Sequence, residues 1–338
     1  MMEENESLKI RNISFLCTIG VLILHSYDPT YSNSTHLAKY VMEIEYYFSS
    51  AMFGHFCVSL FFAISGYLIA FGITSKDDYI RKLKRRVSSL FFPYIFWTLA
   101  CYVFYLFLSF LPVISSFVSE SAKLSMQDLW LAISSQKYAS HMWYVRNLLI
   151  YNLTVPLLLM LFKRKYTTYI LFALMIISIL VGFNFAPFYI NRYLLFALGG
   201  YLGNRRSFTF FFAPKKYISI TCLILFVTYP FVMMAYRNTI IDSLGYVLMP
   251  LFGWYAYDLL NLKKTIKYSN YGFIIYCGHR IIIECFKHLI KYTLHDNAIT
   301  MIISYIISPC ISFTIVLISA MIIKHYLPRT YSFISGNR

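Results

Sequence analysis

The sequence predicts an all-α protein, a polytopic membrane bundle of about ten transmembrane helices with cytoplasmic N- and C-termini. Three observations predict this class. Of the 338 residues, 59% are hydrophobic and only 13% are charged, with a mean hydropathy of +0.61. Apolar runs of membrane-spanning length recur from end to end. The basic residues collect in alternate gaps between these runs. Together these features exclude a soluble protein.

A helix needs about 20 mainly apolar residues to cross a hydrocarbon core of roughly 30 Å, and about 17 suffice when tilt is small. Ten stretches meet this requirement, although the sixth is interrupted by Gly199 and Gly200 and the ninth carries four charged or titratable side chains. The predicted spans are residues 11–27, 50–73, 88–112, 143–162, 167–186, 188–204, 217–236, 243–260, 271–293 and 299–323.

The loop charges predict the orientation. Most of the 30 Lys and Arg residues lie in the two tails and the even-numbered gaps, so both termini are predicted to be cytoplasmic. This topological bias explains the net charge of +16, and no nucleic-acid partner is expected, because the basic residues do not follow one face.

No extramembrane segment is long enough for a separate soluble domain, so residues 1–338 are predicted to form a single integral-membrane domain. The longest loops, 28–49 and 113–142, are expected on the non-cytoplasmic side. No cleaved signal peptide is expected. The seven cysteines are scattered without a CxxC pair, which predicts neither a disulfide framework nor a metal site.

A titratable residue within a span is costly to insert and is therefore a functional candidate. A single histidine near a span end can equally be an interfacial group bonded to a neighbour. The candidates are His25 ending the first span, His55 starting the second, His141 and Arg146 entering the fourth, and His279, Arg280 and Glu284 in the ninth.

The first three histidines are expected in the outer half, where a neutral imidazole could take a proton from a hydroxyl nucleophile. His279 is expected at mid-membrane depth, as a structural or pore-lining residue. Arg146 needs a partner, and Glu284 is a possible one. A structural ion pair and an anion-binding role both fit this arginine.

The basic run at 81–86 is typical of a stop-transfer and phospholipid anchor. It also fits an anion site for a phosphate-bearing cytoplasmic ligand, because Arg binds phosphate bidentately. Aromatic residues make up 20% of the chain. Packing and interfacial belts account for most of them, and stacking on sugar rings remains open.

These landmarks, in this order, resemble the acyltransferase 3 family of integral-membrane O-acyltransferases over nearly the whole chain. The segments that carry the resemblance are RNISFLCTIGVLILHS at 11–26, SLFFAISGYLIA at 59–70, the basic run followed by PYIFW at 93–97, HMWYVRNLL at 141–149, and SNYGFIIYCGHRII at 269–282.

The resemblance implies a ten-helix bundle in a bacterial plasma membrane. It would move an acyl group, most often acetyl, from cytoplasmic acyl-CoA to a hydroxyl of an envelope polysaccharide or lipid-linked sugar. Acetyl-CoA would be a substrate, and no bound cofactor or metal ion is expected. The expected partners are acyl-CoA, the glycan acceptor and membrane lipids.

The resemblance also assigns residues. His25 matches the family's catalytic histidine, as base or acyl carrier. The family's supporting Arg would fall at Ser14, so Arg11 is the nearest candidate. The acyl-CoA phosphates would meet Lys82, Arg85 and Arg86, with Arg81 as a substitute. The candidates for the cavity or the acceptor side are Ser65, His141, Trp143, Arg146, Tyr276 and His279.

The sequence also fits two other function classes. A carrier or flippase for a glycan precursor would also need many spans, aromatic cavity walls and buried charges, but it would not need His25. A structural subunit of an envelope complex would leave the buried titratable residues unexplained. The sequence contains no GxSxG elbow that would supply a competing nucleophile.

Overall fold

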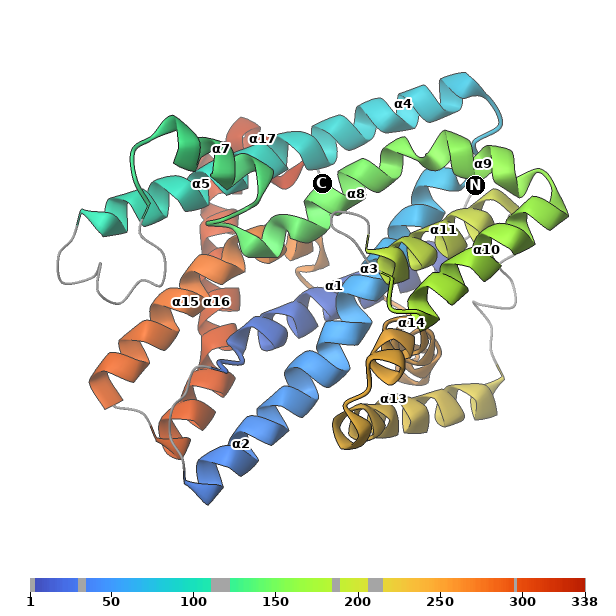
Figure 1. Ribbon diagram of the computed structural model, residues 1–338. Helices are drawn as coiled ribbons and strands as arrows, with labels where there is room; N and C mark the ends of the chain where they lie inside the picture. Colours follow the sequence, from blue (N-terminus) through green and yellow to red (C-terminus); the bar gives the residue numbers. More distant parts are fainter. Residues whose placement is uncertain are drawn as a thin grey trace. The chain divides into compact units, whose positions relative to one another are not determined.

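The computed structural model describes residues 4–29, 35–110, 122–183, 189–205, 215–294 and 297–337. Within these ranges the regular structure is helical throughout, with no strand (Figure 1). The predicted all-α class is therefore confirmed.

Five helical stretches of the described chain are long and apolar enough to cross a membrane. A bent pair, Ser140–Leu153 and Val155–Phe162, forms a sixth if its two parts, which meet at 52°, are one span. Pro156 lies in the first turn after the break, where its missing N–H and its ring favour a bend. The five stretches are Glu4–Ser26, His36–Ala70, Lys76–Ser109, Lys216–Tyr236 and Ala298–Tyr326.

The other four predicted spans coincide with helices that are shorter or less apolar. These helices are α10 (Lys165–Leu180), α11 (Ile190–Arg205), α14 (Thr239–Ala256) and α15 (Gly272–Leu294). The count of ten spans and the orientation of the termini therefore stay predictions.

The two segments expected to be long loops contain helices. Within 28–49 lies α2 (His36–Tyr46), which continues through the π-helical turn η1 (Tyr47–Gly54) into α3 (His55–Ala70). α2 is amphipathic and buries only one stripe, Ala38 and Val41, against Ala298 and Met301, so it lacks the continuous apolar run of a span. Within 113–142, the described part contains α7 (Met126–Ser134) and the short helix η3 (Ser140–Met142).

The remaining elements follow the predicted order. The chain contains α1 (Glu4–Ser26), α4 (Lys76–Arg86), η2 (Val87–Phe91), α5 (Phe92–Ser109), α8 (Trp143–Leu153), α9 (Val155–Phe162), α13 (Lys216–Tyr236), η4 (Tyr257–Leu260), η5 (Ser269–Tyr271), α16 (Ala298–Tyr326) and α17 (Pro328–Ser335).

Packing divides the chain into two compact units, each built from separate stretches of sequence. Unit 1 comprises Met1–Leu24, Tyr46–Lys84 and Ile150–Ser269, and unit 2 comprises His25–Glu45, Arg85–Leu149 and Asn270–Arg338.

Unit 1 is organised by the close packing of α3 against α11 (Figure 1). Glycines on both helices allow the two backbones to touch. A Cβ atom at Gly66 would lie 2.0 Å from the carbonyl oxygen of Phe196, and one at Gly199 would lie 1.9 Å from that of Ala63. These positions accept no side chain, which is how small residues bring membrane helices together.

Gly199→Ala should therefore destabilise the protein by about 1–3 kcal/mol or more, because the new methyl group meets backbone that cannot rotate away. The matched control is Gly200→Ala on the same helix, where the nearest heavy atoms would be 3.8 Å from the new Cβ. That variant should be neutral or more stable by up to about 1 kcal/mol, from helix propensity. Thermal unfolding in detergent micelles compares the two, and equal melting temperatures would contradict the packing argument.

Unit 2 contains α15 and α16 side by side, with α5 and α17 packed on them (Figure 1). Ile274, Ala320 and Tyr331 share a buried cluster, and the Trp97 Nε1–H donates to the carbonyl oxygen of Ile334 over 3.1 Å.

In the same unit, Asp128 of α7 accepts hydrogen bonds from a residue before that helix and from a residue after it. Its carboxylate accepts from the Lys123 backbone N–H at 2.8 Å and from the Lys137 ammonium at 3.2 Å. The Lys123 hydrogen bond is the largest cause that holds the pKa of Asp128 below its ordinary value.

Because the Asp128 pKa is lower in the folded than in the unfolded protein, its contribution to stability is present above about pH 4 and is lost as pH falls through the folded-state value. Asp128→Asn should therefore lower the melting temperature at neutral pH, and the difference from the parent should shrink below about pH 4. Glu43→Gln, at an exposed position on α2, is the control and should leave the melting temperature at neutral pH close to that of the parent. A constant difference across the acid range would contradict this role of the carboxylate.

Candidate active site

Three imidazole rings gather in unit 2. They come from the last turn of α1 (His25), from η3 (His141) and from α15 (His279). The centroid of the His279 ring lies 5.1 Å from that of His25 and 5.2 Å from that of His141. His141 and His279 are 2% and 0% exposed. Segments far apart in the sequence thus place three titratable side chains in one cluster, in which His25 is half-buried.

Backbone carbonyl groups fix the tautomers of two of these rings. His279 Nδ1 lies 2.6 Å from the Tyr276 carbonyl oxygen, and His141 Nε2 lies 2.9 Å from that of Cys277. A carbonyl oxygen only accepts, so each of these nitrogens carries the proton. The opposite nitrogens, His279 Nε2 and His141 Nδ1, are then buried lone pairs that have no hydrogen-bond partner among the described residues.

His25 differs from these two rings, because the group that holds it is a hydrogen-bond donor. The Arg280 guanidinium lies with Nη1 2.9 Å from His25 Nδ1. A guanidinium has no acceptor, so Nδ1 receives this hydrogen bond and the neutral ring carries its proton on Nε2. Arg280 is itself fixed by Glu284, one turn further along α15, at 2.8 Å. His25 therefore presents an N–H group, whereas its two neighbours present lone pairs.

Further hydrogen bonds brace the cluster. The Tyr276 hydroxyl donates to the His141 carbonyl oxygen at 2.5 Å, and the Ser312 hydroxyl donates to that of His279 at 3.0 Å. Tyr276, predicted as a cavity residue, thus holds the backbone of η3 against α15. The ring positions are consequently set by α15 and α16 together.

A polar stripe continues from the imidazoles along α15. Lys287, 7% exposed, donates to the Tyr27 carbonyl oxygen at 2.9 Å. Glu45 on α2 is 3% exposed, and its Oε1 has no partner among the described residues. Of Arg280, Lys287 and Glu45, only Arg280 was among the functional candidates from the sequence, and its contact with His25 was not predicted. The sequence signal for two of them is the charged spacing at 280, 284 and 287, one helical face within an apolar run.

The suggested partnership of Arg146 with Glu284 is wrong. Glu284 pairs with Arg280, its neighbour at i−4 on the same helix, and Arg146 Nη1 donates instead to the Ser134 carbonyl oxygen at 2.9 Å. Trp143, half-buried, begins α8 in unit 2. Ser65 is buried in α3 of unit 1.

Arg11 does not contact His25. It is exposed on α1, and 14 residues of helix separate the two positions by about 21 Å along the axis. The arginine that does contact His25 is Arg280, which comes from the other end of the sequence. A supporting role for Arg11 at His25 therefore stays a prediction that no contact between the two side chains supports.

His55 lies in unit 1 and has no lone pair to offer. Its Nδ1 faces the Ser50 carbonyl oxygen at 2.8 Å and its Nε2 faces the Asp242 carboxylate at 2.9 Å. The Ser50 carbonyl oxygen only accepts, so Nδ1 carries a proton, and Nε2 shares a hydrogen bond with the Asp242 carboxyl group. Tyr246 stacks on this ring at 4.0 Å. Both ring nitrogens are therefore engaged in this structure, and the role of proton acceptor that the sequence suggested for His55 stays a prediction.

The basic run at 81–86 forms the second half of α4, which ends at Arg86. Lys82 Nζ donates to the carbonyl oxygens of Leu68 and Ile69, at 3.0 and 3.1 Å, and to that of Phe71. Its three ammonium hydrogens thus cap the C-terminal end of α3. Arg85, by contrast, is exposed, and Arg86 is half-buried. Arg81 pairs with Asp78 at 2.5 Å.

Lys82→Met should consequently destabilise the protein by about 1–3 kcal/mol, since three carbonyl groups lose a charged donor. Lys84→Met, an exposed position on the same helix, should leave the melting temperature unchanged within about 1 °C. Thermal unfolding of both variants in micelles tests the cap. If Lys82→Met melts with the parent, the side chain is available for a ligand instead.

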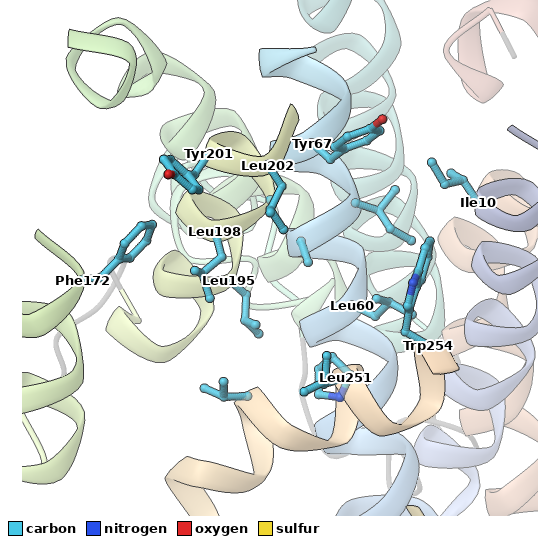
Figure 2. Close-up of a pocket in the computed structure, with 15 residues that line it drawn as sticks. Ile10, Leu60, Tyr67, Phe172, Leu195, Leu198, Tyr201, Leu202, Leu251 and Trp254 are labelled. Atoms are coloured by element: carbon cyan, nitrogen blue, oxygen red, sulfur yellow. The ribbon is translucent and has the colours of Figure 1, made fainter. Parts of the chain in front are cut away.

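Unit 1 also contains an apolar cavity of about 410 Å³ between α3, α11 and α14. Figure 2 shows Leu195, Leu198 and Leu202 on one side and Leu60 and Trp254 on another. Such walls suit a hydrocarbon chain and offer no charged group to the phosphates of a nucleotide.

In the described chain, no three His, Cys, Asp or Glu side chains converge closely enough to hold a metal ion, the imidazole cluster included.

Comparison with known proteins identifies the family to which the chain belongs. A family model described as an acyltransferase domain matches residues 10–324, nearly the whole chain. Neither a curated protein nor a solved structure matches significantly.

Proposed function

Because the chain belongs to this acyltransferase family of membrane proteins, we propose that it is an O-acyltransferase of a bacterial plasma membrane. Its donor is cytoplasmic acyl-CoA, most often acetyl-CoA. Its acceptor is a hydroxyl group of an envelope polysaccharide or a lipid-linked sugar. The observation that carries this proposal is the cluster of His25, His141 and His279.

The chemistry of the cluster matches what acyl transfer requires. Attack of a hydroxyl on a thioester needs a base for the hydroxyl proton and a donor for the oxygen of the tetrahedral intermediate. The cluster offers unengaged lone pairs on His141 and His279 and an N–H group on His25. Burial of His141 and His279 away from water strengthens the electrostatic interactions of these two rings.

His25 remains the residue on which the proposal depends most. As base or acyl carrier it would need a lone pair, and its Nδ1 lone pair is engaged by Arg280 in this structure. As a donor it would use Nε2–H without rearrangement. In each of these roles, loss of the ring removes an interaction that forms with the reacting groups.

The donor site is proposed at the end of α4, where Arg85 is exposed and Arg86 follows it. Guanidinium groups bind phosphate bidentately and suit the phosphates of coenzyme A. Lys82 contributes to this site only indirectly, by fixing the end of α3.

The direct test is transfer of radiolabel from acetyl-CoA to envelope glycan in membranes that carry the protein. His25→Ala should lower the initial rate by at least about 100-fold at matched expression, because base, carrier and donor roles are each worth about that much. His325→Gln, at an exposed position near the end of α16, should retain the parent rate.

Each outcome decides between functions. Label that appears with the parent and vanishes with His25→Ala supports acyl transfer through this site. Equal label in both removes His25 from the reaction. Export of an unmodified glycan precursor by the parent, with no transfer of label from acetyl-CoA or other acyl-CoA donors, would favour the carrier that the sequence left open.

A further inference from the structure

The two neighbouring rings His25 and His279 are held in opposite tautomers. Arg280 requires a proton on His25 Nε2, and the Tyr276 carbonyl oxygen requires one on His279 Nδ1. One ring therefore presents a donor and the other a lone pair, with 5.1 Å between their centroids. Attack of a hydroxyl on a carbonyl group needs a lone pair that accepts the hydroxyl proton. It also needs a nearby N–H group that donates to the carbonyl oxygen as negative charge develops there.

We propose that His279 Nε2 is the proton acceptor of the transfer reaction and that His25 Nε2–H is the donor to the thioester carbonyl oxygen. This inference rests on the proposed function. It assigns to His279 the role of base that the family resemblance implied for His25.

The lone pair of His279 is unengaged and oriented. Its Nε2 is fully buried and has no hydrogen-bond partner within the described residues. The opposite nitrogen is anchored to the Tyr276 carbonyl oxygen, and the backbone of His279 accepts from Ser312. A base oriented through its other nitrogen is the arrangement found where an imidazole activates a hydroxyl.

A packing role alone would leave His279 Nε2 without a hydrogen bond. Buried polar atoms in folded proteins are almost always hydrogen-bonded, since an orphaned lone pair opposes folding. His141 carries a similar lone pair on Nδ1, but the ring of His279 is the one that contacts His25. A hydroxyl bound against His279 Nε2 would therefore stand next to a carbonyl group held by His25.

The step balances without a further reactant. The acceptor oxygen forms a bond to the thioester carbon as its proton passes to His279 Nε2, and the carbonyl oxygen gains negative charge at His25 Nε2–H. The intermediate then collapses, the carbon–sulfur bond breaks, and the coenzyme A thiolate takes the proton from the His279 imidazolium. The products are the ester and the free thiol, and both rings return to their starting tautomers.

Matched amide substitutions separate the lone pair from the hydrogen bond on each ring. In His279→Asn, the amide nitrogen replaces Nδ1–H toward Tyr276, and the Nε2 lone pair is lost. In His141→Gln, the amide nitrogen replaces Nε2–H toward Cys277, and the Nδ1 lone pair is lost. His325→Gln is the outside control.

Purified protein with acetyl-CoA and isolated envelope glycan gives kcat and KM for each variant. We expect His279→Asn to lower kcat by about 10²–10⁴-fold, the usual worth of a general base, with KM for acetyl-CoA changed less than about threefold. His141→Gln should lower kcat by less than about tenfold. Added imidazole should raise the rate of His279→Ala at least about tenfold, because it supplies a base in the space left by the ring.

The inference is overturned if His279→Asn keeps a kcat within about tenfold of the parent, or if His141→Gln loses more than His279→Asn. If His279→Asn fails to fold, as judged by its melting temperature, the imidazole experiment on His279→Ala decides, and absence of rescue counts against the proposal. A parent protein that transfers no acyl group at all would instead contradict the proposed function.

Discussion

The hydrogen bond from Arg280 to His25 is the interaction on which the rest of the site depends. It joins the last turn of α1 to α15, and because a guanidinium only donates, it also sets the tautomer of the imidazole. Glu284 holds Arg280 from the next turn of the helix. Without that ion pair, an arginine in an apolar helix would be free to turn toward other acceptors, and the tautomer of His25 would no longer be fixed.

The same helix supplies the second half of the arrangement. Tyr276 and His279 are one turn apart on α15, so the carbonyl oxygen of one receives Nδ1–H of the other. Cys277, between them, receives the hydrogen bond of His141. One turn of α15 thus orients two rings and, through Arg280, the third. Hydrogen bonds to fixed backbone groups need no reorganisation during a reaction, which favours catalysis in a low-dielectric interior.

Much of this organisation could be predicted from the sequence, and the missing parts have physical reasons. Hydropathy predicted the helical class and selected His25, His141 and His279, because titratable residues stand out within apolar runs. Which helices face each other does not follow from periodicity, so Arg280 was placed with its span but not with His25. Arg146 and Glu284 were paired by charge alone, but Arg280 lies one helical turn from Glu284 on the same helix and pairs with it instead. α2 was missed because an amphipathic helix of 11 residues has no span-length apolar signal.

The buried charges of α15 also explain why this helix is less apolar than a simple span. Lys287 donates to the carbonyl oxygen of Tyr27, which directly follows α1. Together with the hydrogen bond from Arg280 to His25, this gives α15 two contacts with the end of α1. The unpartnered Glu45 oxygen lies on α2, which belongs to the same unit. A helix that only anchored the protein would gain nothing from such groups, since each is costly to bury. The hydrogen bonds of Arg280 and Lys287 instead hold His25 and Tyr27 in fixed positions, and the reduced hydropathy of α15 is the consequence of building the site on it.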